Sequence, residues 1–240
     1  MTNRFGFHSS SHPVSLNLDG EDDLGSSDPP FDRLNLGLKV GDDRQRVLRN
    51  REQVTKGCGV DRIIFMDQIH SNLMIDAARG GEAQCDGIYQ PRAEADIRHA
   101  LAVQVADCVP LILEHPKVIA AVHVGREGLV KGMTEAAIEG LRPLAQPFEI
   151  KATIGPSICG DCYPLSAETF DECAMRYPAS VYDARDRKVD VATGVISTLE
   201  DLGIAWQWFG GERECVACDK EYFSYRRDGV TGRQAMVVGW

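Results

Sequence analysis

One cysteine and two histidines stand at the ends of apolar runs in this sequence. Cys108 follows the run that begins at Leu101, His123 lies near the end of Val118–Val124, and His70 comes shortly after Ile63–Met66. Apolar runs of this length, bounded by chain-breaking residues, are typical of buried strands. Three Cys and His ligands leave a fourth coordination position open, as in a catalytic zinc site and unlike a closed structural one. The sequence therefore indicates a catalytic metal site at these three residues.

The same residues allow two other interpretations. Histidine is often a hydrogen-bonded structural residue, and a lone buried cysteine often behaves as a small apolar side chain. Cys108 with His123 or His70 could also form the thiolate–imidazole pair of a cysteine hydrolase. Metal coordination would quench that nucleophile, so the metal site and the nucleophile exclude each other in any one state.

Two Cys-x-x-Cys pairs, Cys159–Cys162 and Cys215–Cys218, carry a separate signal. Each pair has the spacing found in zinc knuckles. A long segment with two expected helices separates the pairs, and free thiols are the alternative interpretation. These four cysteines are therefore candidate ligands of a second, structural zinc.

The number of histidines excludes multicopper oxidation. A blue-copper site and a trinuclear copper cluster together need on the order of ten histidines. The chain has six histidines and no His-x-His pair. One zinc remains compatible with this supply of ligands, and copper could occupy the same three ligands in vitro.

Composition places the chain among ordinary globular proteins. Of its 240 residues, 43% are hydrophobic and 26% are charged, and the net charge is −10. The negative charge disfavours a nucleic acid or an anionic membrane as a partner. The N-terminus lacks the apolar core of a secretion signal, and no run of about 18 apolar residues occurs. We therefore expect a cytoplasmic protein whose eight cysteines are reduced or bound to metal; the sequence does not indicate its oligomeric state.

Strands and helices mix along the chain without strict alternation, which predicts an α+β fold in a single layered domain over residues 1–240. The acidic, Gly-, Ser- and Pro-rich segment 19–33 is expected to be a mobile loop. Expected strands lie at 14–18, 62–66, 73–77, 149–154, 205–209 and 233–240, with two central strands within 101–124, and residues 85–88 are expected to form a turn. Expected helices run from Asp42 or Asp43 to Gly57, within 126–145, from Ser166 to Pro178 and from Asp190 to Gly203.

Eight stretches, in order, resemble the family described as laccase-domain, polyphenol-oxidase-like or YfiH-like purine nucleoside phosphorylase. They are NLG at 35–37, VGDD at 40–43 with Asn50-Arg51, DQIHS at 67–71, CDG at 85–87, ADCVPLIL at 106–113, AAVHVG at 120–125, IGPSIC at 154–159 with Tyr163, and FSYRRDGVTGR at 223–233. The resemblance implies a layered α+β sandwich related to cysteine-hydrolase-like toxin domains. It also implies a metal site at His70, Cys108 and His123, with Arg51 facing the same pocket.

The activity that the resemblance implies is zinc-dependent phosphorolysis of purine nucleosides, with adenosine deamination as a second reaction. A purine nucleoside and phosphate would then be the small-molecule partners. The same family is also associated with a cysteine-dependent amidase that edits peptidoglycan precursors. A homologue that binds metal or nucleoside but has lost turnover is a third hypothesis.

Under the first hypothesis, the sequence nominates two sets of residues. Arg51 would offset the charge of phosphate, and Asp107 would orient a ligand, shuttle a proton or cap a strand end. Arg226 and Arg227 could hold an anion through their guanidinium groups or form structural ion pairs. The candidate catalytic residues are Cys108, His123, Arg51 and Asp107, and the candidate substrate-binding residues are Asn35, Arg51, Gln68 and Arg226.

The sequence departs from the family pattern after His123. Relatives usually have Ala-Gly-Trp-Arg-Gly there, whereas this chain has Val124-Gly125-Arg126-Glu127-Gly128. The acidic residue that usually follows the tyrosine is Pro164. A carboxylate at Glu127 close to phosphate would repel it, so the departure predicts weaker phosphate use than in typical relatives.

Overall fold

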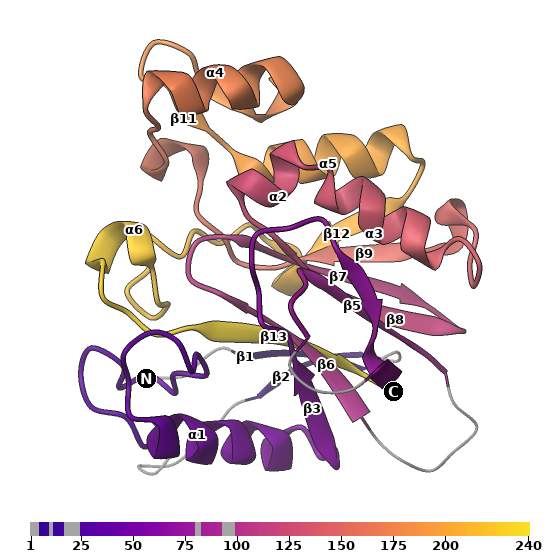
Figure 1. The fold of residues 1–240 in the computed structure, drawn as a ribbon, viewed down its shortest axis with the longest axis vertical. Coiled ribbons are helices and arrows are strands. Elements are labelled where there is room, and N and C mark those ends of the chain that lie inside the picture. Colours follow the sequence, from indigo (N-terminus) through magenta and orange to yellow (C-terminus); the bar gives the residue numbers. More distant parts are fainter. Residues whose placement is uncertain (1–4, 10–11, 17–24, 80–82, 93–98) are drawn as a thin grey trace.

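Two β-sheets lie face to face in the computed structural model, with helices on both outer faces (Figure 1). The structure describes residues 5–9, 12–16, 25–79, 83–92 and 99–240. The first sheet has the order β2 (His12–Leu16), β1 (Phe5–Ser9), β13 (Gln234–Gly239), β6 (His99–Val105) and β3 (Arg62–Phe65). The second has the order β12 (Ala205–Trp208), β9 (Lys151–Ile154), β7 (Val109–His115), β8 (Val118–Val124), β5 (Gly87–Pro91) and β4 (Met74–Asp76).

Helices cover the outer face of each sheet. Helix α1 (Arg44–Gly57) packs on the first sheet, and α2 (Arg126–Val130), α3 (Met133–Leu141) and α5 (Val191–Asp201) pack on the second. Helix α4 (Ala167–Arg176) and the small sheet of β10 (Val181–Asp183) and β11 (Lys188–Val189) extend this helical side, and α6 (Tyr225–Asp228) precedes β13. The predicted α+β single-domain layered fold is confirmed. Its relation to cysteine-hydrolase toxins stays a prediction.

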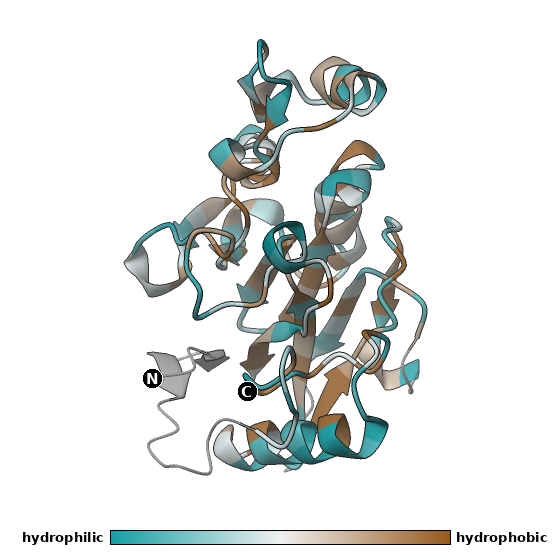
Figure 2. Ribbon diagram, turned by 90° about the vertical axis from the view of Figure 1, so that its left-hand side faces the viewer, coloured by the Kyte–Doolittle hydropathy of each residue, from teal (hydrophilic) through white to brown (hydrophobic). Residues whose placement is uncertain are grey.

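Alternate side chains of the central strands face opposite layers of the fold. In β6, Ala100 and Ala102 face α1, while Leu101, Val103 and Val105 face the second sheet. In β7 and β8, alternate residues face either the first sheet or the helices. A strand that is covered on both faces needs apolar residues at successive positions, which explains the near-continuous apolar runs in the sequence. Figure 2 shows the same apolar strands between more polar helices.

Side-chain caps fix the starts of the long helices, as the sequence predicts. The carboxylate of Asp43, the hydroxyl of Ser166 and the carboxylate of Asp190 each accept a hydrogen bond from a backbone N–H three residues later. Such bonds satisfy N–H groups that the first turn leaves without partners. The expectation of a single helix within 126–145 is wrong, because this segment forms two helices, α2 and α3. Gly132 lies between them in a left-handed conformation with φ 77°.

Two further expectations about the central region are wrong. The apolar segment from Leu101 to Val124 contains three strands and not the expected two. The chain leaves the first sheet after β6 and enters the second at β7. The crossing lies at Asp107 and Cys108, and Asp107 takes φ 106° there. The segment 85–88 is not a turn, because β5 begins at Gly87. Cys85 and Asp86 precede it and are fully buried.

The expected mobile loop at 19–33 lies partly outside the described residues, which begin again at 25. In the described part, the Ser27 hydroxyl donates to Asp42, and the N–H of Ser26 donates to Asn50. Phe31 is buried in this segment. Within the described ranges, no helix combines the length and the apolar character needed to cross a membrane.

Candidate metal centre

The side chains of His70, Cys108 and His123 meet at the junction of the two sheets. One potential ligand atom from each lies within 4.8 Å of the other two. The Cys108 Sγ is 3.9 Å from His70 Nε2, and the two imidazole rings are 4.9 Å apart at an interplanar angle of 83°. A metal ion could therefore contact all three side chains at once.

Each residue reaches this point from a connection or strand that joins the sheets. His70 lies between β3 of the first sheet and β4 of the second, and Cys108 lies between β6 and β7. His123 is on β8, next to residues that face the first sheet. His70 has φ 56°, in the left-handed region that non-glycine residues seldom occupy. The site thus depends on how the two sheets are placed against each other.

Asp86 supports the two histidines from behind and was not among the residues nominated from sequence. Its carboxylate accepts hydrogen bonds from His123 Nδ1 at 2.8 Å, from the N–H of His70 at 3.0 Å and from both the N–H and the hydroxyl of Ser71. Burial would raise the pKa of Asp86, but hydrogen bonds from His123 and Ser71 outweigh burial and lower the pKa to about 2. An ionised Asp86 fixes a proton on His123 Nδ1 and leaves Nε2 available as a ligand. The CDG stretch at 85–87 was the sequence signal for this residue.

Gly125 leaves the space that this cluster needs. A Cβ at this position would lie 2.9 Å from His70 Cδ2, which is closer than real Cβ contacts, and 3.0 Å from Cys108 Sγ, which is tighter than most of them. The backbone of Gly125, with φ −83°, is open to any residue, so the requirement is for space. Two imidazole nitrogens and one thiolate, with a buried carboxylate behind them, form a donor set that fits zinc.

Without a metal, the same atoms form a charged pair. Burial raises the pKa of Cys108, but the His123 and His70 imidazoles outweigh burial and bring it down to about 6. Burial lowers the pKa of His123, whereas the Cys108 thiolate and Asp86 raise it to about 9. A thiolate stabilised by an imidazolium is chemically suited both to metal binding and to nucleophilic attack.

A cavity of about 370 Å³ opens beside the three ligands. Arg51 lies on its wall, where Nε donates to the carbonyl of Leu36 at 2.9 Å and the guanidinium carbon is 3.9 Å from the centre of the Phe65 ring. The lining also contains Arg233 and Lys39, neither of which was nominated from sequence. Arg233 ends the FSYRRDGVTGR stretch, which was its only signal. The lining residues are Gly37, Leu38, Lys39, Val40, Arg51, Met66, Asp67, Gln68, His70, Gln104, Val105, Ala106, Cys108, His123, Tyr225 and Arg233.

The nominated substrate-binding residues divide between the cavity and its supports. Gln68 lines the cavity, and its side-chain amide bonds to both the N–H and the carbonyl of Gln104. Asn35 lies outside the lining and is fully buried, with its amide bonded to Asp42, Gly37 and the N–H of Arg233. The Arg226 guanidinium also lies outside the lining and sits 4.8 Å from the centre of the Tyr163 ring.

Asp107 is placed as a structural cap. Its carboxylate accepts a hydrogen bond from the Ser224 hydroxyl at 2.6 Å and another from the N–H of Arg226 at 2.6 Å. Burial raises its pKa, against the effect of these bonds. Asp107 therefore holds the start of α6 beside Cys108, and among the described residues it does not line the cavity.

Two of the residues that depart from the family pattern, Arg126 and Glu127, form ion pairs with neighbouring charged residues. Arg126 forms ion pairs with Glu127 at 3.3 Å and with Glu172 of α4 at 3.6 Å. Glu127 also pairs with Lys131 at 3.3 Å. Neither Arg126 nor Glu127 is among the described residues that line the cavity. The weaker phosphate use that the sequence predicts therefore stays a prediction.

Comparison with known proteins gives consistent matches over nearly the whole chain. The family described as multi-copper polyphenol oxidoreductase laccase matches residues 21–240. A Streptomyces coelicolor protein named purine nucleoside phosphorylase is 39% identical over 227 residues, which cover 89% of this chain and 90% of the relative. The crystal structure of a Neisseria meningitidis protein of the DUF152 family matches with a TM-score of 0.80 and 30% identity, over 90% of this chain and 89% of that one. The YfiH structure from Bacillus licheniformis matches with a TM-score of 0.75 and 27% identity, over 89% and 88% of the two chains.

Proposed function

Because the chain belongs to the family described as multi-copper polyphenol oxidoreductase laccase, and because similar curated proteins are named purine nucleoside phosphorylase, we propose that it is a zinc-dependent purine nucleoside phosphorylase. The observation that carries the proposal is the His70–Cys108–His123 cluster beside a cavity lined by Arg51 and Arg233. This arrangement puts a metal-ligand set and two guanidinium groups on one cavity. Both kinds of group suit an anionic substrate.

The size and the lining of the cavity support the two proposed substrates. Small-molecule sites generally measure about 300–1,000 Å³ and combine apolar walls with a few polar groups. Leu38, Val40 and Met66 supply apolar surface for a purine ring. Arg51 and Arg233 supply guanidinium groups that match the oxygens of phosphate.

In phosphorolysis, a phosphate oxygen forms a bond to ribose C1′ while the bond from C1′ to the purine nitrogen breaks. The purine leaves with the electron pair of that bond and takes up a proton. Arg51 and Arg233 would hold phosphate close to C1′ and offset its charge. His70, Cys108 and His123 would hold zinc, which when bound supplies Lewis-acid polarisation of an oxygen ligand. Asp86 would orient the ring of His123 and hold the backbone of His70.

Oxidation by a multicopper mechanism is not supported, despite the family description. The chain has six histidines, and two of them belong to this cluster. A set of two histidines and one cysteine falls far short of what a blue-copper site and a trinuclear cluster need together.

A cysteine-dependent amidase acting on peptidoglycan precursors is the second candidate. One observation favours it, namely that Cys108 Sγ lies 3.9 Å from His70 Nε2 within the cluster that also contains His123. These imidazoles bring the pKa of Cys108 down to about 6 against the effect of burial, while that of His123 rises to about 9. This pairing would give a reactive thiolate in metal-free protein. Zinc bound to the same sulfur would suppress that activity.

The test compares metal-replete and metal-free protein on three substrates. Phosphorolysis requires that purine release from inosine or adenosine depends on phosphate and is lost on chelation. Ammonia release from adenosine without phosphate would indicate deamination. Cleavage of a peptidoglycan-precursor amide that increases on chelation would favour the second candidate, and Cys108→Ala should abolish whichever reaction is found. Nucleoside binding without turnover under all conditions would contradict both candidates and support a binding protein.

A further inference from the structure

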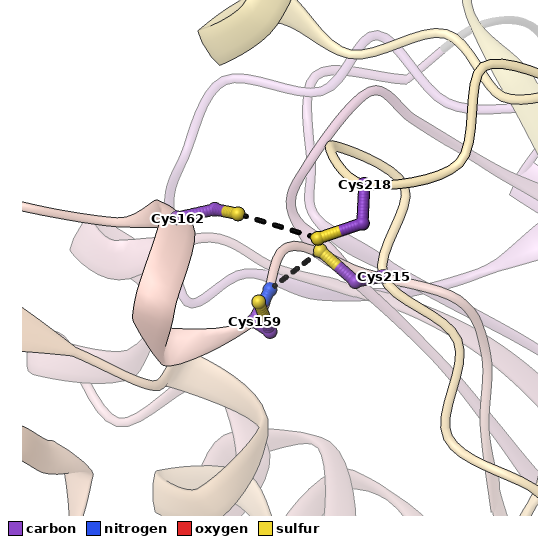
Figure 3. A group of neighbouring side chains, drawn as sticks. All are labelled: Cys159, Cys162, Cys215 and Cys218. Carbon is purple, nitrogen blue, oxygen red and sulfur yellow. Dashed lines mark hydrogen bonds between the residues drawn. The ribbon is translucent and has the colours of Figure 1, made fainter.

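Four cysteines gather in a second cluster, apart from the proposed catalytic site. Cys159 and Cys162 follow β9, whereas Cys215 and Cys218 lie between β12 and α6 (Figure 3). The four sulfur atoms all lie within 4.8 Å of one another, and Cys162 Sγ is 3.5 Å from Cys218 Sγ. Among the described residues, none of these cysteines lines the cavity beside His70.

The backbone of each Cys-x-x-Cys segment forms a closed turn. The N–H of Cys162 donates to the carbonyl of Cys159 at 3.1 Å, and the N–H of Cys218 donates to the carbonyl of Cys215 at 3.2 Å. In addition, the N–H of Cys159 donates to Cys215 Sγ at 3.2 Å, across the two segments. Hydrogen bonds from backbone N–H groups favour the thiolate form, which is the form that binds a metal.

Other contacts hold the two segments together independently of the sulfur atoms. The N–H of Ser157 donates to the carbonyl of Glu214, and the N–H of Val216 donates to the carbonyl of Ser157, both at 3.3 Å. The buried carboxylate of Asp190 accepts hydrogen bonds from the N–H of Gly160 at 3.3 Å and from Arg213 at 2.5 Å. The protein therefore brings the two turns together in advance, which lowers the cost of closing a metal site.

We propose that Cys159, Cys162, Cys215 and Cys218 bind a structural zinc ion. Zinc–sulfur bonds of about 2.3 Å in a tetrahedron put the sulfur atoms about 3.8 Å apart, which the present cluster can reach with small adjustments. Four sulfur donors favour zinc over magnesium or calcium and leave no open position for a substrate. Binding would deprotonate the thiols and release their protons to solvent.

This zinc would brace the peptide frame behind the catalytic cluster. The Arg227 guanidinium donates to the carbonyls of Val216 and Asp219, both at 2.9 Å, and so ties the second cysteine segment to α6. The N–H of Ile158, next to Cys159, donates to the carbonyl of Asp107 at 2.9 Å. The carboxylate of Asp107 bonds in turn to the start of α6. Both cysteine segments therefore connect to Asp107, which directly precedes Cys108.

The experiment counts metal in full-length protein purified with zinc present. Wild type should hold about two zinc ions per chain, and Cys162→Ala with Cys218→Ala should hold about one. His70→Ala with Cys108→Ala should also hold about one, and that remaining zinc should be lost on combining all four substitutions. Cys58→Ala with Cys173→Ala removes the same number of thiols from outside both clusters and should leave two. This design separates failure of the second site from failure of the proposed catalytic site.

Cobalt substitution supplies a readout that does not rely on the cysteine variants. In His70→Ala with Cys108→Ala, the bound cobalt should show the intense absorption of tetrahedral thiolate coordination, and a chelator should lower the melting temperature. The proposal is overturned if the protein binds zinc only at His70, Cys108 and His123. Iron in place of zinc, or a Cys162–Cys218 disulfide detected by mass spectrometry of unreduced protein, would overturn it as well.

Discussion

The thiol of Cys108 lies between two imidazoles, and we expect this placement to control its reactivity. Burial alone would raise its pKa, but His123 and His70 bring it to about 6. In metal-free protein, the rate of Cys108 alkylation by iodoacetamide should therefore rise with pH to half its maximum near 6 and be almost maximal at pH 7. Peptide mass spectrometry measures this rate for each cysteine in the same sample.

Cys58 is the internal control for this measurement. Burial raises the pKa of Cys58 to about 12, so this thiol should stay almost unmodified at pH 7. Added zinc should protect Cys108 because the metal would occupy its sulfur. A half-maximal rate near pH 9 for Cys108 would mean that the two histidines do not stabilise its thiolate.

Arg51 offers a planar guanidinium to the cavity. Arg51→Lys keeps the positive charge but removes the fixed planar arrangement of N–H donors. Lysine cannot reproduce a two-point contact with phosphate, and a lost hydrogen bond to a charged group costs about 1.5–3 kcal/mol. Under the proposed function, the KM for phosphate should rise about tenfold or more. Nucleoside affinity measured without phosphate should change little.

Arg49→Lys is the matched control, since Arg49 is an exposed residue of the same helix. It should leave the KM for phosphate unchanged. Arg51 also bonds to the carbonyl of Leu36, so the melting temperature of each variant needs to be measured. Equal weakening of phosphate and nucleoside binding would indicate that Arg51 holds the fold of the cavity rather than phosphate.

At the scale of elements, the approach of α2 to the metal ligands depends on a missing side chain. Gly125→Ala should push a Cβ against His70 and Cys108, at 2.9 Å and 3.0 Å, without straining the backbone. We expect zinc affinity to fall by about tenfold or more, the range found when groups around metal ligands are altered. Competition with a chromophoric chelator measures this affinity.

Gly128→Ala tests whether any added methyl group in α2 has the same effect. Its Cβ would have Met133 Cβ as the nearest atom, at an ordinary contact distance of 3.5 Å. Alanine is also favoured over glycine inside a helix by about 0.5–1 kcal/mol. This variant should bind zinc like wild type, and equal losses in the two variants would contradict the steric explanation.

Element types and helix starts were predictable because their causes are local. Asp43, Ser166 and Asp190 cap helices through residues three positions along the chain, and the apolar runs of β3, β8 and β13 reflect burial. The division between β6 and β7 was missed because both strands are apolar and only the sheet to which each belongs separates them. Periodicity within a run carries no information about its partners.

Site residues whose role depends on distant contacts were the harder ones to predict. His70, Cys108 and His123 were predictable from their types, from their places at the ends of apolar runs and from the stretches that resemble the family. Asp86 acts through His123, 37 positions away, and Arg233 reaches the cavity from the start of β13. Asp107 was nominated for catalysis, yet its carboxylate bonds to Ser224 and Arg226, more than 100 positions along the chain.

For the molecule as a whole, the candidate metal centre is a product of the packing of one sheet on the other. His70 and Cys108 lie on connections between the sheets, and His123 lies on the second sheet. The apolar core between the sheets includes Leu101, Val103 and Met236 from one side and Ile112 and Ile119 from the other. A separate core lies between the second sheet and its helices. Disturbing the first of these cores should therefore affect the site more than disturbing the second.

Ile112 and Leu113 allow this to be tested with neighbouring residues of one strand. Both are fully buried in β7, but Ile112 belongs to the core between the sheets and Leu113 to the core beneath the helices. Truncation to alanine should destabilise the protein in each case, by about 2–5 kcal/mol as measured by urea unfolding of metal-free protein. Zinc affinity, measured in the absence of denaturant, should fall clearly in Ile112→Ala and stay close to wild type in Leu113→Ala. Equal zinc affinities in two equally destabilised variants would mean that the ligands are held by their local connections, independently of how the sheets pack.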